Sequence, residues 1–183
     1  MRADPGFQEL RTSRLRLRRS EPGDAEQISA YRSDPDVHEH QGWDHTDPDH
    51  IRTEISEMLT RAPGQPGGWV QFTVLTLDDD RLVGDVGLRV DGDEQGVILV
   101  GYTMDPAAQN KGYATEAVGA LVEYAFDTLG ADLVRAYAEA SNVASIRVAD
   151  KVGMPVVDRF THHEDDQTWH VVRMERPRPP DRG

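Results

Sequence analysis

Residues 109–117 read QNKGYATEA, and the patterns on either side of them indicate the fold class of the chain. A strand pattern, GVILVGYTM (96–104), comes before, and an amphipathic helix begins at Gly112. The helix is indicated by apolar residues at helical spacing: Ala114, Ala117, Val118, Leu121, Val122, Ala125, Phe126 and Leu129. A strand, a tight turn and a long helix together direct unpaired backbone N–H groups and the positive end of the helix dipole at one place. The stretch therefore predicts an anion-binding turn at residues 109–114.

The turn does not match the two common nucleotide-binding patterns. A dinucleotide fold requires G-x-G-x-x-G, and a nucleoside triphosphate loop requires G-x-x-x-x-G-K-[ST]. Here Lys111 comes before Gly112 instead of after it, and no Ser or Thr is placed to hold magnesium. The expected anion is therefore a phosphate of another kind of ligand.

The remaining patterns predict one α/β domain with a mixed sheet. Before the turn we expect a strand, two helices and three antiparallel strands, and after its helix a strand, a helix and a strand hairpin. The expected strands are 15–18, 69–77, 81–90, 96–104, 133–140, 155–163 and 167–175. We expect flexible tails at 1–10 and 177–183, with the folded domain at 11–176.

The composition favours a cytoplasmic protein that binds cations. The 183 residues include no cysteine, which excludes disulfides and thiolate metal sites, and no segment has the apolar length of a membrane span. The net charge of −13 argues against nucleic acid and anionic membranes as partners and favours a cationic one. The alternative is that the acidity only keeps the protein in solution.

The spacing Gln109-x-x-Gly112-x-Ala114 resembles the signature of the GNAT superfamily of acyl-CoA N-acyltransferases. Asn142-x-x-Ser145 and Lys151-Val152-Gly153-Met154 follow at the positions that this resemblance requires. The sequence around these motifs is similar to that of the RimJ/RimL-like branch, which acetylates the N-termini of ribosomal proteins. The resemblance implies a single-domain GNAT-like fold: a central, mostly antiparallel sheet of about seven strands, splayed between the fourth and fifth, with about four helices.

The resemblance also implies that acetyl-CoA is the cosubstrate, with its pyrophosphate on the turn and its pantetheine arm along the strand before it. The residues that it assigns to this binding are Tyr102, Thr103, Met104, Gln109, Asn110, Lys111, Gly112, Tyr113, Ala114, Asn142, Ser145 and Lys151. The alternative is that Gly112 is an ordinary turn glycine and Asn142 an ordinary helix cap.

The two side chains that family members often use for proton transfer are missing here. The strand before the turn carries no glutamate at 97–100, and Ala149 stands where many members have a tyrosine. The remaining candidates are Ser145, as a donor to the leaving thiolate, and Asp85 or Glu139, as acceptors of the amine proton through water. The alternative for both acids is a solvated charge on a strand face.

Residues 33–49 have no helical or strand period, so we expect a long loop there. In the GNAT fold that the chain resembles, this loop forms a wall of the acceptor cleft. Trp43 and Asp44 are therefore the candidate acceptor-binding residues. The histidines at 38, 40, 45 and 50 match no zinc spacing, so we expect no metal. A solvated loop anchored by one tryptophan is the alternative.

Three functions are consistent with these patterns. The first is acetylation of a protein N-terminal α-amine, and the second is acetylation of a small polycation such as an aminoglycoside or polyamine. The third is an acyl-CoA-binding regulator that has lost turnover. The sequence leaves the oligomeric state open, and a homodimer could form through the edge of the C-terminal hairpin.

Overall fold

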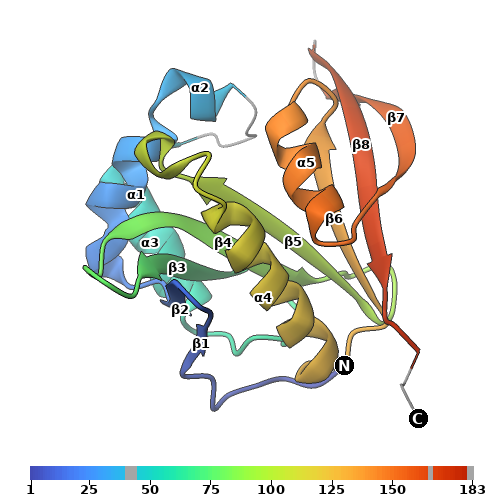
Figure 1. Ribbon diagram of the computed structural model, residues 1–183, viewed down its shortest axis with the longest axis horizontal. Helices are drawn as coiled ribbons and strands as arrows, with labels where there is room; N and C mark the ends of the chain where they lie inside the picture. The colour runs from blue at the N-terminus through green and yellow to red at the C-terminus, as the bar shows by residue number, and fades with distance from the viewer. Residues whose placement is uncertain (40–44, 165–166, 181–183) are drawn as a thin grey trace.

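The computed structural model describes residues 1–39, 45–164 and 167–180 and contains one mixed sheet (Figure 1). Within these ranges the sheet has eight strands in the order β1-β2-β3-β4-β5-β6-β8-β7. Their bounds are β1 Glu9–Arg11, β2 Leu15–Arg19, β3 Val70–Thr76, β4 Leu82–Val90, β5 Val97–Met104, β6 Leu133–Glu139, β7 Val156–Glu164 and β8 Gln167–Pro177. All neighbouring strands are antiparallel except β5 and β6, so the predicted mixed sheet and its antiparallel meander are confirmed.

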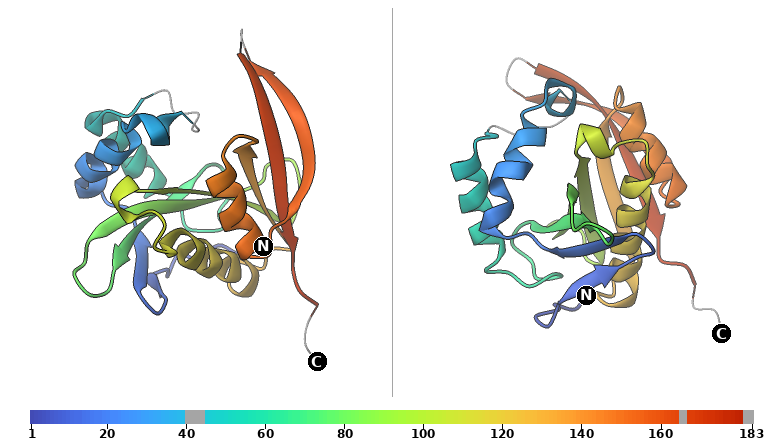
Figure 2. Two further views of the ribbon diagram at one scale, coloured as in Figure 1. Left: turned by 45° about the horizontal axis from the view of Figure 1, so that its top comes forward. Right: turned by 60° about the vertical axis from the view of Figure 1, so that its left-hand side comes forward.

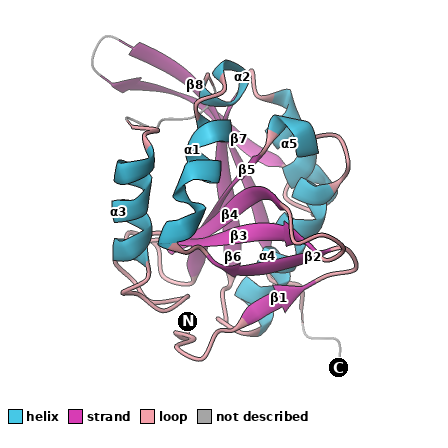
Figure 3. Cartoon of the chain, turned by 90° about the vertical axis from the view of Figure 1, so that its left-hand side faces the viewer, coloured by secondary structure: helices cyan, strands magenta, loops and turns pink. Residues whose placement is uncertain are grey.

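Helices cover both faces of the sheet (Figures 2 and 3). The five α-helices within the described ranges are α1 Ala25–Arg32, α2 Pro35–His38, α3 Pro48–Met58, α4 Tyr113–Asp127 and α5 Val143–Lys151. Helices α1 and α3 pack together on one face, and α4 lies along the other face with α5 beside it. A further short 3-10 turn, Pro106–Ala108, connects β5 to the residues before α4.

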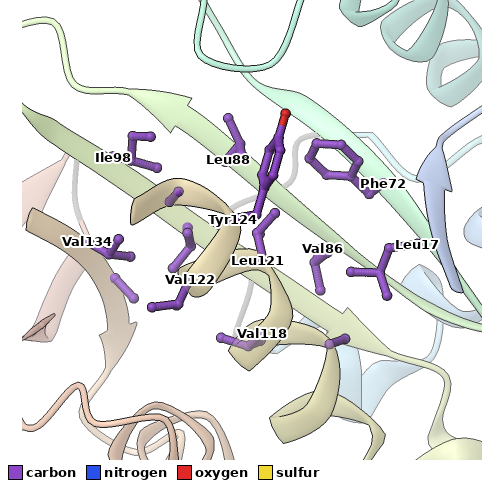
Figure 4. Packing of buried hydrophobic residues seen from close by; sticks show 14 of the residues in the cluster. Leu17, Phe72, Val86, Leu88, Ile98, Val118, Leu121, Val122, Tyr124 and Val134 are labelled. Carbon is purple, nitrogen blue, oxygen red and sulfur yellow. The ribbon is translucent and has the colours of Figure 1, made fainter. Parts of the chain in front are cut away.

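Helix α4 is the centre of the larger apolar core, as its pattern predicts. Val118, Leu121 and Val122 are fully buried, and they face the sheet side chains Val86, Leu88 and Ile98 (Figure 4). The helix is followed by Gly130, whose φ of 73° is the left-handed conformation of a helix-ending glycine. Burial of apolar surface contributes roughly 25 cal/mol per Å², so this packing holds α4 against the sheet.

The splay expected in the sheet lies between β5 and β6. These strands pair in parallel at three positions only, Val97 with Leu133, Ile98 with Val134 and Leu99 with Arg135. Beyond Leu99 they diverge, while β5 stays paired with β4 as far as Met104. The edge of β5 from Val100 to Met104 therefore has no strand beside it on the β6 side among the described residues.

Two segments differ from the expectations. The segment 1–10, expected as a tail, contains part of a strand, because Glu9 and Leu10 belong to β1, and Phe7 packs edge-on against Phe72 at 5.0 Å. The expected loop at 33–49 contains α2, because Asp34 caps the Asp36 amide at 3.0 Å and Pro35 occupies the first helical turn. Both segments are too short for a periodic pattern to reveal them.

The C-terminal boundary also differs slightly. Strand β8 extends to Pro177, and the Arg178 amide donates to the Asp132 carbonyl at 2.8 Å, so the chain is held two residues into the expected tail. Among the described residues, none of the helices has the length and apolar character needed to cross a lipid bilayer.

Candidate active site

A cavity of about 580 Å³ opens where β5 and β6 diverge. Its walls come from the end of β5, the turn before α4, the first turn of α4, one side of α5 along its length, and α2. Of the residues that we expected to bind the cofactor, all but Lys111 line it: Tyr102, Thr103, Met104, Gln109, Asn110, Gly112, Tyr113, Ala114, Asn142, Ser145 and Lys151. The structure thus brings together residues from three separate segments of the sequence.

The turn between β5 and α4 has an unusual backbone. Asn110 and Gly112 both have left-handed φ angles, 60° and 82°, and Gly112 is the N-cap of α4. Within the described residues no side chain caps this helix, so the first-turn N–H groups are available to a ligand. An uncapped helix start that faces a cavity is suited to an anion.

The side chains of the turn point away from these N–H groups. The Lys111 ammonium donates to the Ala107 carbonyl at 2.9 Å, and the Gln109 side-chain amide donates to the Met104 carbonyl at 3.4 Å. Lys111 therefore contributes to the turn through its backbone and stabilises the preceding 3-10 turn with its side chain.

A carboxylate in the first turn of α4 connects this turn to the N-terminal part of the chain. Glu116 accepts hydrogen bonds from the Thr12 hydroxyl at 2.6 Å and from the Arg14 Nε at 2.7 Å. Burial favours the neutral acid, but these hydrogen bonds outweigh it and lower the pKa of Glu116. In the sequence, Glu116 is an acid close to the start of the expected helix, and no local signal identifies its distant partners.

Tyr102 and Ser145 form a hydroxyl pair on the cavity wall. The Tyr102 phenol donates to the Ser145 carbonyl oxygen at 2.8 Å, and the Ser145 hydroxyl donates to the phenol oxygen at 3.0 Å. Burial raises the pKa of Tyr102, although the Ser145 hydroxyl opposes this, so the phenol is protonated at neutral pH. Tyr102 is among the expected cofactor-binding residues, but its contact with Ser145 is not predictable, because a strand pattern does not show what a side chain meets.

Asn142 is the N-cap of α5. Its side-chain oxygen accepts from the Ser145 amide at 2.9 Å, which fixes the first turn of the helix that carries Ser145. The helix-cap alternative for Asn142 is thus realised, and its position on the cavity wall allows contact with a ligand as well.

The charges around the cavity differ from one wall to another. Arg147 and Lys151 lie four residues apart on α5, and both line the cavity beside the turn. Asp36 on α2 is the single carboxylate residue among the described residues that line it. This arrangement provides cations for a phosphate-bearing ligand and one acid on the opposite side for a cationic one.

The two acids considered as proton acceptors are not on the cavity wall. Asp85 is buried on β4, where its carboxylate accepts from the Tyr31 phenol and pairs with the Arg32 guanidinium at 3.3 Å. Burial in this cluster raises the pKa of Tyr31 well above its ordinary value. Glu139 ends β6 opposite Val171 of β8. Neither residue lines the cavity.

The remaining expectations concern the loop around α2. Trp43 and Asp44, the candidate acceptor-binding residues, lie outside the described residues. The His45 and His50 rings are 4.7 Å apart, but within the described ranges no group of three or more His, Asp or Glu side chains could hold a metal ion.

A family model, a curated relative and two solved structures are similar to this chain. A model of the acetyltransferase (GNAT) domain matches residues 14–155. The uncharacterized N-acetyltransferase p20 of Bacillus licheniformis is 29% identical over 144 residues, which is 78% of this chain and 80% of that protein.

Two solved structures share the fold at lower identity. One is RimL, a ribosomal L7/L12 alpha-N-protein acetyltransferase in complex with coenzyme A, with a TM-score of 0.78, 15% identity and coverage of 93% of this chain and 98% of that one. The other is a chimera of the spermidine N-acetyltransferase SpeG from Vibrio cholerae and hSSAT, with a TM-score of 0.74, 18% identity and coverage of 90% and 96%. Because the domain model spans most of the chain, from Arg14 to Pro155, this protein belongs to the GNAT acetyltransferase family and is an acetyl-CoA-dependent acyltransferase.

Proposed function

We propose that the protein transfers the acetyl group of acetyl-CoA to the α-amine of a protein N-terminus. The observation that carries this proposal is the composition of the cavity wall: an uncapped helix start at one side and, among the described residues, a single carboxylate at the other. The first feature suits an anionic cosubstrate. The second suits an amine that requires little help to lose its proton.

The residues present fit acetyl-CoA in chemistry and in size. The N–H groups of Gly112, Tyr113 and Ala114 are suited to the pyrophosphate, and small residues at 112 and 114 allow the backbone to come close to it. Residues 102–104 of β5 lie beyond its pairing with β6 and line the cavity, so in our proposal the amide-bearing pantetheine arm lies along them in the manner of an added strand.

The scarcity of carboxylates on the cavity wall favours an α-amine as acceptor. With a pKa of about 7.7 to 8.0, an α-amine is roughly a tenth to a fifth neutral at pH 7. A lysine side chain with a pKa of about 10.4 is neutral only about four times in ten thousand, so it depends far more on a base. We infer that the α-amine loses its proton to water or, through water, to Asp36.

Ser145 and Tyr102 are suited to the other proton requirement of the reaction. The amine nitrogen forms a bond to the thioester carbon, the carbon–sulfur bond breaks, and the thiolate that leaves must be stabilised or protonated. In our proposal the Ser145 hydroxyl turns from the phenol oxygen to the sulfur and donates to it. The Tyr102 phenol keeps its own hydrogen bond to the Ser145 carbonyl oxygen and so holds that residue in position. Its raised pKa keeps the phenol neutral and excludes it as a base at neutral pH.

Acetylation of a small polycation is the second candidate function. Two observations favour it: the net charge of −13, and the exposed carboxylate of Asp36 on the cavity wall. A polyamine would gain from both, because its additional charges interact with the acidic protein at a distance.

We expect thiol release from acetyl-CoA with N-terminal peptides as acceptors, measured with a thiol reagent against a panel that includes polyamines and aminoglycosides. The same peptides with a blocked N-terminus and a free lysine are the control. Faster turnover with polyamines would replace the first candidate by the second. Coenzyme A binding without thiol release from any acceptor would indicate a regulator instead of an enzyme.

Gly112→Val should weaken coenzyme A binding by on the order of a hundredfold, because a β-branched residue cannot adopt the left-handed φ of 82° and its side chain would meet the Arg14 guanidinium. Titration calorimetry measures the loss. Gly130→Val is the matched control, because it places the same strain, at a φ of 73°, at the other end of α4. Equal affinity in the Gly112 variant and the wild type would refute the placement of the pyrophosphate.

Asp36→Asn should raise the KM for a cationic acceptor about threefold to tenfold, with the larger effect at low ionic strength, because an exposed charge is screened by salt. The KM for acetyl-CoA should stay the same. Asp78→Asn removes the same charge at an exposed turn outside the cavity and serves as the control. An unchanged acceptor KM at low salt would remove Asp36 from acceptor binding.

Ser145→Ala should lower kcat by on the order of a hundredfold, with little change in the KM for acetyl-CoA, because the hydroxyl acts when the thiolate leaves. Tyr102→Phe should lower kcat less, since it removes only the group that positions the serine. Steady-state kinetics with an N-terminal peptide measures both. Wild-type kcat in Ser145→Ala would exclude the hydroxyl from the mechanism.

A further inference from the structure

The carboxylate of Glu116 is saturated by one short segment of the chain, residues 12–14. Its Oε1 atom accepts from the Thr12 hydroxyl at 2.6 Å, the Ser13 hydroxyl at 3.0 Å and the Arg14 amide at 2.9 Å. Its Oε2 atom accepts from the Arg14 Nε at 2.7 Å and lies 2.6 Å from the Arg14 Nη2. Because Nε and Nη2 both contact this one oxygen, the planar guanidinium is held in one orientation.

The third nitrogen of the same guanidinium reaches the phosphate-binding turn. Arg14 Nη1 donates to the Lys111 carbonyl oxygen at 3.0 Å, and the guanidinium carbon lies 4.8 Å from the centre of the Tyr113 ring. Arg14 is thus in contact with the residues on both sides of Gly112. It approaches the turn from behind, since Arg14 and Lys111 are not among the residues that line the cavity.

This contact determines where the Gly112 N–H points. In a trans peptide the C=O of one residue and the N–H of the next are directed to opposite sides, so the Lys111 carbonyl and the Gly112 N–H move as one unit. Because Arg14 holds the carbonyl on the outer side, the Gly112 N–H is directed away from Arg14. Gly112, whose φ is left-handed, borders this peptide unit, and a glycine allows the unit to rotate easily.

The ion pair of Arg14 and Glu116 also reduces the repulsion between the Glu116 carboxylate and a bound anion. A carboxylate in the first turn of α4 repels an anion bound at the same helix start. Arg14 offsets that charge, and the two side chains together are neutral. Losing the arginine alone would leave an unbalanced negative charge next to the ligand phosphates.

We propose that Arg14 is a positioning residue for pyrophosphate binding: held by Glu116, it fixes the peptide between Lys111 and Gly112 with the Gly112 N–H directed to the ligand. This inference rests on the proposed placement of the pyrophosphate at the turn. It adds a residue 95 positions or more from the binding signature, from a segment that the signature does not include.

The test compares coenzyme A with pantetheine, which has the same arm but lacks the pyrophosphate. Arg14→Ala should weaken coenzyme A binding about tenfold or more, the cost of losing a charge-assisted hydrogen bond, and should change pantetheine binding less than about twofold. Arg14→Lys should weaken coenzyme A binding almost as much as Arg14→Ala does, because one ammonium cannot bridge the carboxylate and the carbonyl as the guanidinium does. Titration calorimetry measures both affinities for each variant.

Arg16→Ala is the matched control, because it removes the same charge two residues away, where the guanidinium binds Asp80 at 2.9 Å and does not touch the turn. It should leave the affinity for coenzyme A unchanged. The double variant Arg14→Ala, Glu116→Ala should be no weaker than Arg14→Ala alone, since the two residues act as one unit.

Three results would overturn the inference: equal losses for coenzyme A and pantetheine, wild-type affinity in Arg14→Lys, or the same loss in Arg16→Ala. Failure of the proposed pyrophosphate placement would look different. In that case the wild type itself would bind coenzyme A no more tightly than pantetheine, and the inference would fall with the placement. If the wild type prefers coenzyme A and the Arg14 variants keep that preference, only the inference about Arg14 fails.

Discussion

The first turn of α4 presents backbone N–H groups that the helix itself cannot bond, and the rest of the molecule holds this turn in place. The buried face of the helix packs on the sheet, and at its other end the Leu129 carbonyl accepts from the Arg2 amide at 2.7 Å. The helix therefore cannot shift along its axis to find other partners for its free groups. Groups fixed in advance cost little reorganisation when an anion binds, and this is why a rigid core serves a binding site at its edge.

The divergence of β5 and β6 is the second structural constraint, and it follows from the fixed position of the α4 start. Helix α4 connects these two strands, and a parallel pair requires such a crossover. Close pairing along the whole length would leave no space in front of the helix start. Three paired positions hold the strands together at one end, while the separation at the other end leaves the β5 edge and the α5 start facing each other across the cavity.

The sequence predicts the parts of this arrangement that depend on periodicity and local motifs. The eight apolar positions from Ala114 to Leu129 identify α4, and the turn signature identifies most of the cavity wall. Contacts between distant residues are not predictable in this way. The Tyr102 phenol meets Ser145 across the splay between β5 and β6, and Arg14 meets Glu116 because β2 lies under α4. Short elements such as β1 and α2 are not predicted from the sequence for a different reason, because three or four residues are too few to show a period.

The charge of the whole protein and the charge at the site have opposite signs, and distance explains why both can be useful. At physiological ionic strength charges are screened beyond about 8 Å, so an anionic cosubstrate at the turn is governed by the groups next to it. Those groups are the helix start, Arg147 and Lys151, with Glu116 already balanced by Arg14. The acidic surface acts before contact, where it favours the approach of a cationic acceptor and slows that of the anionic cosubstrate. Under the proposed placement of the pyrophosphate, a helix start that binds without reorganisation compensates for the slower approach by holding the cosubstrate longer, since affinity differences lie mostly in the rate of dissociation.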